Sequence, residues 1–161
     1  MKVQIENAVS HGYLSGVKMF DLIRAQKGLL YSKYNPIAGR KDLRPIDFKD
    51  QTMYTFANDD GPLGLASNER LLGKKYGFKP KYKIVSSIDA IFMALSTGEG
   101  YAVVDSMVRA KNNSDFEYIE LDDYNTVSIA MLDDNQNSQS VLFMNYCLSY
   151  FGALTAKEEE G

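Results

Sequence analysis

Residues 83–105, KIVSSIDAIFMALSTGEGYAVVD, decide the fold class of this chain. The first of them favour a strand, and Ser86 with Asp89 three positions later forms a capping-box-like helix start. Apolar residues at helical spacing follow, namely Ile88, Ile91, Phe92 and Leu95. Gly98 supplies a left-handed helix stop, and residues 101–104 are an apolar run typical of a buried strand. Strands joined by so short a crossover are parallel, so the stretch predicts an open α/β sheet.

Apolar runs alternate with Gly, Pro, Asn and Asp turns along the rest of the chain. We expect strands at residues 17–25, 29–33, 53–57, 81–85, 116–121 and 126–132, and helices at residues 4–12, 63–76 and 137–154. A turn at Gln26-Lys27-Gly28 separates the first two strands, and Pro62 suits the start of the second helix. The predicted fold is an open mixed sheet with a parallel three-strand βαβαβ core, formed by residues 53–57, 81–85 and 100–104.

Composition points to an ordinary globular protein. The chain has 161 residues, 45% of them hydrophobic, which suffices for one core with room for two small lobes that share a sheet. The net charge of −3, without a Lys/Arg-rich run, disfavours binding to DNA or to an anionic membrane. No segment is apolar enough for a membrane span or a signal peptide. One cysteine, Cys147, fits a reducing compartment, so we expect a soluble cytoplasmic protein.

A ligand site is expected beyond the carboxyl ends of the parallel strands, where open sheets of this kind bind ligands. Two helix N-termini reach this edge, and their unpaired N–H groups suit a carboxylate or phosphate. Asp59 and Asp60 suit an amine or a hydroxyl instead, so the ligand chemistry stays open. Equally, Ser86 can simply cap its helix and Gly61 can simply turn the chain. The candidate ligand-binding residues are Asn58, Asp59, Gly61, Ser86, Ser87 and Asp105.

The residues that support catalysis or metal binding are scarce. His11 is the single histidine and Cys147 the single cysteine, which excludes a His/Cys zinc site and a Cys–His pair. No nucleophile-elbow, P-loop or dinucleotide-binding glycine motif is present. Asp122-Asp123 and Asp133-Asp134 are expected in turns, where acidic residues are common. We therefore predict no enzyme activity, no metal site and no cofactor.

The run from residue 30 to residue 132 resembles the effector-binding domain of LysR-type transcriptional regulators, which has a periplasmic-binding-protein-like fold. The matching segments are YSKYNPIAGRKDLRPIDFKD (31–50), MYTFA (53–57), LLGKKYGFKP (71–80), IVSSIDAIFMALSTGEGYAVVD (84–105) and FEYIELDDYNTVSIAML (116–132). The resemblance implies a small-molecule effector held without catalysis and a signal passed to a DNA-binding domain. A solute-binding module of the same fold and an enzyme lobe, such as an amino-acid-pathway dehydratase, are the alternatives.

This sequence departs from the family pattern in three places. Asp105 stands where the family has a proline, and Thr97-Gly98-Glu99-Gly100 replaces Ala-Gly-x-Gly. Most of the first lobe and the winged helix-turn-helix have no counterpart, so this chain is not expected to contact DNA. The resemblance divides the chain into a first-lobe remnant (1–34), an effector-binding second lobe (35–124), and a return strand with a terminal helix and tail (125–161).

The terminal helix carries apolar residues on nearly all sides. Residues 141–151 read VLFMNYCLSYF, whereas a surface helix shows one apolar stripe. The helix is either enclosed in its own core or covers an absent lobe or a second chain. The second possibility predicts a homodimer.

Overall fold

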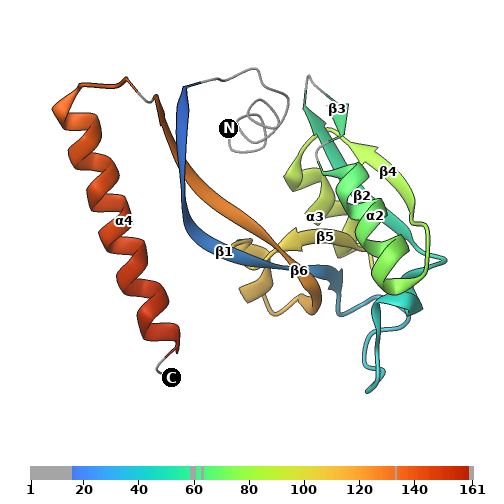
Figure 1. Cartoon of the computed structure of the whole chain (residues 1–161). Coiled ribbons are helices and arrows are strands. Elements are labelled where there is room, and N and C mark those ends of the chain that lie inside the picture. Colours follow the sequence, from blue (N-terminus) through green and yellow to red (C-terminus); the bar gives the residue numbers. More distant parts are fainter. Residues whose placement is uncertain (1–15, 59–60, 63, 133, 160–161) are drawn as a thin grey trace. The chain divides into compact units, whose positions relative to one another are not determined.

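The computed structural model describes residues 16–58, 61, 62, 64–132 and 134–159. The helix expected at residues 4–12 and His11 lie outside these residues. The chain divides into a central unit, Gln26–Tyr124, and a terminal unit formed by Met1–Ala25 with Asn125–Gly161. The elements in chain order are β1 (Val17–Ser32), η1 (Pro45–Phe48), β2 (Thr52–Asn58), β3 (Gly61–Pro62), α2 (Leu65–Tyr76), β4 (Lys81–Val85), α3 (Ile88–Ser96), β5 (Ala102–Asp105), η2 (Arg109–Asn112), β6 (Phe116–Leu132) and α4 (Ser138–Glu159) (Figure 1).

The described strands form two three-stranded sheets, in the orders β3-β2-β4 and β5-β1-β6. β2 and β4 are parallel, in a register that runs from Thr52 opposite Lys81 to Phe56 opposite Val85. α2 connects these two strands, as expected for a parallel crossover. The prediction of a mixed α/β fold is therefore confirmed.

The predicted three-strand parallel core is found only in part, because its third strand meets β2 at a single parallel bridge. β5 pairs antiparallel with β1, with Lys27 opposite Asp105. Its link to β2 is one parallel bridge between Met53 and Tyr101, where the Tyr54 N–H donates to the Tyr101 carbonyl at 2.8 Å. An apolar run does not reveal all its neighbours in a sheet. Here β5 pairs with β1, which was not predicted, and the residue before β5 bridges β2.

β1 is one continuous strand rather than two, so the predicted turn at Gln26-Lys27-Gly28 is wrong. Gly28 instead leaves room for the side chain of Tyr118 to pack against the backbone of β1. A Cβ atom there would lie 2.2 Å from Cζ of Tyr118, because the Tyr118 ring lies directly over the glycine. β6 is likewise continuous where two strands were expected, and Asp122 and Asp123 lie within it rather than in a turn.

The helix starts also differ from the predictions. Gly61 and Pro62 form β3, which pairs antiparallel with β2, so Pro62 does not begin α2. The N-cap of α3 is Ser87 rather than Ser86, and its Oγ accepts a hydrogen bond from the Ala90 N–H at 3.2 Å. Both helices end as predicted, because Gly77 and Gly98 follow them with positive φ angles of 75° and 85°.

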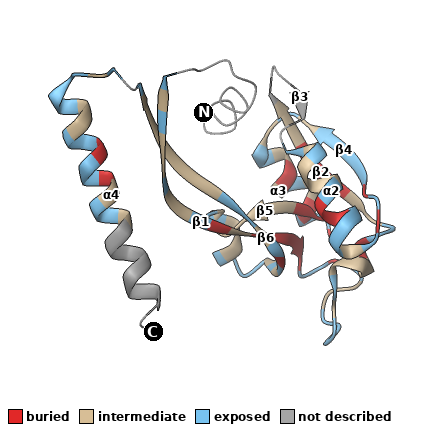
Figure 2. Cartoon of the chain, in the orientation of Figure 1, coloured by how far each residue is buried: buried red, intermediate tan, exposed pale blue. Residues whose placement is uncertain are grey.

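Two hydrophobic clusters fill the central unit (Figure 2). The first contains Leu29, Tyr31, Phe48, Met53, Leu71, Leu72, Phe78, Tyr101 and Leu121, and the second contains Leu30, Tyr54, Ile91, Leu95 and Ala102. Burying one such Leu or Phe side chain contributes about 1.5–3 kcal/mol. Among the described residues of the terminal unit, by contrast, only Ala25, Met144 and Cys147 are buried. Among the residues whose burial is described, the hydrophobic core therefore lies in the central unit.

Candidate functional site

The parallel pairing of β2 and β4 places their carboxyl ends at one edge of the sheet. Asn58 ends β2, and Ser86 and Ser87 directly follow β4. Because Phe56 lies opposite Val85, Asn58 and Ser87 are each two residues beyond a paired position. The N-terminus of α3 therefore begins at this edge, and we take the edge as the candidate site.

Ser86 and Ser87 have different structural roles. Ser87 is partly buried and uses its hydroxyl to cap α3. Ser86 is exposed and is not the capping residue, which corrects the prediction from its spacing to Asp89. A capped helix N-terminus still presents the N–H groups of its first turn to the edge. Ser86 is the more accessible of the two to a solute.

Three of the remaining candidates lie around the β2–β3 turn. Asn58 lies opposite Gly61 in the antiparallel pairing, so the backbones of these two residues are adjacent. Gly61 belongs to β3 and not to the start of α2, contrary to its expected position. Asp59 lies outside the residues that the structure describes. The structure thus brings the backbones of Asn58 and Gly61 together.

Asp105 ends β5 and is partly buried. Its Oδ1 accepts a hydrogen bond from the Met107 N–H at 3.1 Å, which turns the chain after the strand. In the β5–β1 pairing Asp105 lies opposite Lys27. The predicted residue is therefore adjacent, across the strand pair, to a cation that was not predicted.

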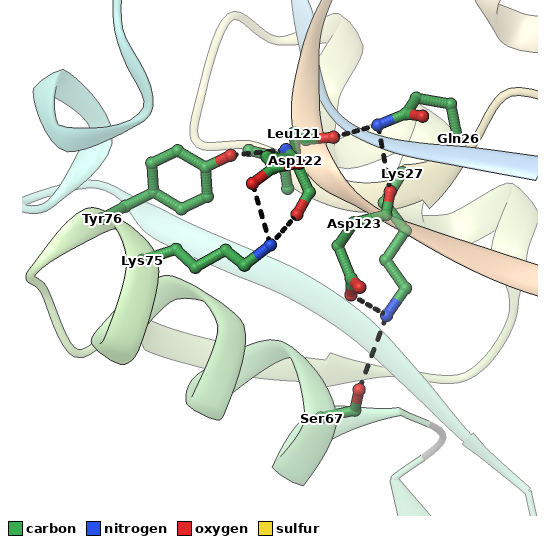
Figure 3. Close-up of polar contacts among 8 residues, drawn as sticks. All are labelled: Gln26, Lys27, Ser67, Lys75, Tyr76, Leu121, Asp122 and Asp123. Atoms are coloured by element: carbon green, nitrogen blue, oxygen red, sulfur yellow. Dashed lines mark hydrogen bonds and ion pairs between the residues drawn. The ribbon is translucent and has the colours of Figure 1, made fainter.

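Lys27 is buried, with 7% of its surface exposed. Its Nζ forms an ion pair with Oδ2 of Asp123 at 2.8 Å and lies 3.5 Å from Oγ of Ser67, in the first turn of α2 (Figure 3). Ala25 and Leu29, two residues to either side of Lys27, are almost fully buried. Strand periodicity places all three residues on one face of β1. The alternation was not recognised in the sequence because Gly28 was assigned to a turn.

The N-terminus of α2 follows a glycine. Its N-cap residue is Gly64, with φ of 67°, and no side chain among the described residues forms the cap hydrogen bond. The first turn contains no acidic residue. A helix N-terminus carries a partial positive charge and N–H donors without a partner inside the helix. Ser67 and Lys27 add a hydroxyl and an ammonium group beside this turn.

Polar contacts around Lys27 tie β1 to β6 within the central unit (Figure 3). Gln26 Nε2 donates to the Leu121 carbonyl and, at 3.1 Å, to the Asp123 carbonyl. The Tyr118 hydroxyl donates to the Gln26 carbonyl at 2.8 Å. We call Gln26, Lys27 and Asp123 the latch. It lies at the positions where β1 enters, and β6 leaves, the central unit.

A second set of contacts ties α2 to β6 next to the latch. Lys75 forms an ion pair with Asp122 at 2.9 Å and also donates to the Asp122 carbonyl. The hydroxyl of Tyr76 accepts a hydrogen bond from the Asp122 N–H at 2.6 Å. The last turn of α2 is thus attached to Asp122 of β6, and its first turn contacts Lys27, which pairs with Asp123, the next residue of β6.

Two groups close to the latch, Tyr118 and Lys75, have raised pKa values. Burial, with smaller effects from Glu120 and Asp105, raises the pKa of Tyr118 to about 12. A hydrogen bond to Asp122 raises the pKa of Lys75. These groups keep their protons at pH 7 and act as hydrogen-bond donors. Nowhere in the described ranges do three or more His, Cys, Asp or Glu side chains form a metal-binding group.

This fold is similar to that of known proteins in solved structures. No family model matches the sequence, and no curated protein matches it. Solved structures do match. The effector-binding domain of QuiR in complex with shikimate has a TM-score of 0.69 at 14% identity, over 93% of this chain and 78% of that chain. The BenM effector-binding domain with benzoate has a TM-score of 0.70 at 18% identity, over 99% of this chain and 77% of that chain.

HinK, a LysR family transcriptional regulator from Pseudomonas aeruginosa, has a TM-score of 0.65 at 16% identity, over 94% of this chain and 57% of that chain. The chain has the fold of LysR effector-binding domains. The predicted resemblance is thereby confirmed for the fold, along almost the whole chain. The same alignments leave about a fifth of each of the QuiR and BenM domains without a counterpart here. No described helix is both long enough and apolar enough to cross a membrane.

Proposed function

We propose that this chain is a small-molecule effector-sensing domain of a LysR-type transcriptional regulator. The observation that carries the proposal is the fold likeness over 93–99% of the chain to two effector-binding domains solved with ligands. Binding without a catalytic step and without a cofactor is part of the proposal. The regulators named above do not favour the alternative of a solute-binding module with the same fold.

The proposed site is the edge formed by Asn58, Asp59, Gly61, Ser86, Ser87 and Asp105. Residues 35–124 form the effector-binding lobe, residues 1–34 the first-lobe remnant, and residues 125–161 the return strand and terminal helix. The pairing of β2 with β4 supports a shared edge at Asn58 and Ser87. The pairing of Asp105 with Lys27 connects that edge to the latch.

The geometry favours an acidic effector. The N-terminus of α2, which has no acidic residue in its first turn, and the N–H groups at the start of α3 both attract a carboxylate. Lys27 provides a buried ammonium group next to Ser67 in the first turn of α2. A carboxylate bound there competes with Asp123 for Lys27. Effector binding would then loosen or replace a contact that holds β1 to β6.

A thermal-shift screen tests effector sensing directly. The first probes are benzoate and shikimate, followed by amino acids and short dicarboxylates. A ligand at 100 times its dissociation constant stabilises the folded state by about 2.7 kcal/mol, so the melting temperature rises. Stabilisation without chemical change of the probe supports the sensor. Conversion of the probe to a product contradicts it.

A pair of cap variants tests the position of the site. Ser87→Asp keeps a capping side chain on α3 and adds a negative charge at the proposed edge, so the shift caused by a carboxylate probe should disappear. Asn137→Asp is the matched control, because Asn137 caps α4 by accepting from the Gln139 N–H at 2.9 Å. The control should keep the full shift. A full shift in Ser87→Asp would place the site elsewhere.

Partners and location follow from the same proposal. A LysR-type sensing domain works beside a DNA-binding domain, and we expect no nucleic-acid contact from this chain itself. A cytoplasmic location is part of the proposal because regulated DNA lies there. Self-association is a separate property, since it does not require an effector.

A further inference from the structure

Strand β4 lies at the edge of its sheet. In the order β3-β2-β4 it has β2 as its one neighbour among the described strands. Residues 81–84 are all exposed, whereas Met53, Tyr54 and Thr55 of the neighbouring β2 are buried (Figure 2). An edge strand carries a row of backbone N–H and C=O groups that have no partner in the sheet. β4 can therefore accept a further strand on its outer side.

The side chains of β4 alternate in chemistry. Lys81 and Lys83 lie on one face of the strand, and Tyr82 and Ile84 lie on the other, because successive strand residues point to opposite faces. Tyr82 and Ile84 are each 46% exposed. A strand that pairs with β4 places its own side chains beside these residues. Acidic side chains suit the positions next to the two lysines, and apolar side chains suit the positions between them.

The sequence around β4 is strongly basic. Residues 70–88 contain no Asp or Glu, and their cations are Arg70, Lys74, Lys75, Lys79, Lys81 and Lys83. Of the five lysines, Lys75 alone forms an ion pair with a described residue, which is Asp122. The net charge of the whole chain is −3, so this stretch is a basic region in an acidic protein. Such a region attracts an acidic partner.

Charge and backbone geometry narrow the choice of partner. A second copy fits poorly, because two β4 strands side by side would place lysines against lysines or against Tyr82 and Ile84. Nucleic acid is disfavoured by the net charge of −3, and it has no peptide groups with which to extend the sheet. An extended acidic peptide satisfies both the exposed backbone and the lysines.

We propose that β4 binds an extended segment of an acidic partner protein, which adds a strand to the edge of the sheet. The segment carries acidic residues at every second position, beside Lys81 and Lys83, and apolar residues between them. The charge pairs are exposed, so binding weakens as the salt concentration rises. Residues 81–84 precede Ser86 and Ser87 in the chain, and binding at this edge requires no effector.

The probe is a fluorescently labelled peptide of four Glu-Val repeats, whose binding is measured by fluorescence anisotropy. The wild-type chain should bind it, with an affinity that falls at least about fivefold between about 0.05 M and about 0.5 M salt. The double variant Lys81→Glu with Lys83→Glu should bind at least about tenfold more weakly, because like charges then lie opposite each other. Lys41→Glu with Lys49→Glu is the matched control. It makes the same change in net charge at two exposed positions outside α2 and β4, and it should bind like the wild type.

Two measurements distinguish strand addition from simple attraction between charges. Bound peptide should slow the hydrogen exchange of backbone amides on the outer side of β4, because they gain hydrogen-bond partners. A second peptide, with four Glu residues followed by four Val residues, has the same composition without the alternation. It should bind several-fold more weakly than the alternating peptide.

Circular dichroism checks that each variant is folded, and Lys81→Gln with Lys83→Gln replaces the double variant if it is not. A wild-type chain that does not bind the alternating peptide at low salt overturns the proposal. Equal binding by the Lys81 and Lys83 variant, equal binding of both peptides, or unchanged exchange in β4 overturns it as well. Binding of a single-stranded oligonucleotide in place of the peptide would assign the basic edge to nucleic acid. A dimer that the Lys81 and Lys83 variant abolishes would assign it to a second copy.

Discussion

The central unit and the terminal unit of this chain both contain large apolar residues, but they bury these residues to different extents. The central unit encloses two hydrophobic clusters, with Leu29, Leu30, Leu72 and Leu95 fully buried. Four large apolar residues of α4 in the terminal unit, by contrast, are more than half exposed, namely Leu142, Phe143, Tyr146 and Tyr150. Hydrophobic content alone is therefore not enough to form a core. The elements must also have neighbours within the chain that cover them.

The largest expected contrast comes from equal truncations in the two units. Leu72→Ala removes a fully buried side chain and should lower the free energy of unfolding by about 2–5 kcal/mol. Leu142→Ala removes one that is 64% exposed and should change it by less than about 0.5 kcal/mol when the chain is monomeric. Urea unfolding measures both. An equal loss in both variants would show that the terminal unit has a core of its own.

A pair of glycine substitutions examines β1, the strand that belongs to both units. Gly28→Ala forces the Tyr118 ring away, because the new Cβ would lie 2.2 Å from the ring, and should cost about 1–3 kcal/mol. Gly73→Ala in α2 meets no atom within 4 Å and should stabilise the chain by about 0.5–1 kcal/mol. Chemical denaturation distinguishes the two signs. Tolerance of Gly28→Ala would mean that the ring does not hold β1 at this point.

The smallest expected effect concerns a hydroxyl in the core of the central unit. Tyr101 is fully buried, and its hydroxyl has no hydrogen-bond partner among the described residues. Tyr101→Phe should therefore stabilise the protein by about 1 kcal/mol. Tyr31→Phe is the control and should destabilise it by a similar amount, because the Tyr31 hydroxyl donates to Glu117 at 2.6 Å.

Alkaline unfolding provides the second measurement on the same pair. Burial raises the pKa of Tyr101 above its ordinary value near 10. The folded state thus holds this proton more tightly than the unfolded state, and the related stability is complete below pH 10 and falls as pH rises beyond it. Tyr101→Phe should reduce the loss of stability above pH 10. An unchanged pH profile would show that Tyr101 is not responsible for it.

The sequence predicted the elements whose boundaries are set by local chemistry. Gly77 and Gly98 end α2 and α3 because a left-handed residue stops a helix whatever surrounds it. The start of α3 was predicted one residue early, since Ser86 and Ser87 are both good caps and only the fold selects between them. Local signals therefore gave the order of elements in the central unit, with errors of a few residues at their starts.

The parts that failed depend on contacts between distant residues. Gly28 looks like a turn residue in the sequence, but it is needed because the ring of Tyr118, ninety residues later, covers it. The ion pair of Lys27 with Asp123 was missed for the same reason. In the candidate site, the positions of Ser87 and Asp105 at strand ends were predicted from the pattern of apolar residues. The latch could not be predicted, because it depends on which strands pair.

The insertion of the central unit between the two parts of the terminal unit has a consequence for synthesis of the protein. Residues 17–25 leave the ribosome well before their neighbours in β6 are made, as the hydrogen bond from Ser128 to Asp21 at 2.8 Å illustrates. The central unit, being continuous in sequence, can fold in between. During that interval the first half of β1 is an unpaired strand edge, open to pairing with other nascent chains. Chaperone demand for this protein should therefore depend on how quickly residues 26–132 are translated.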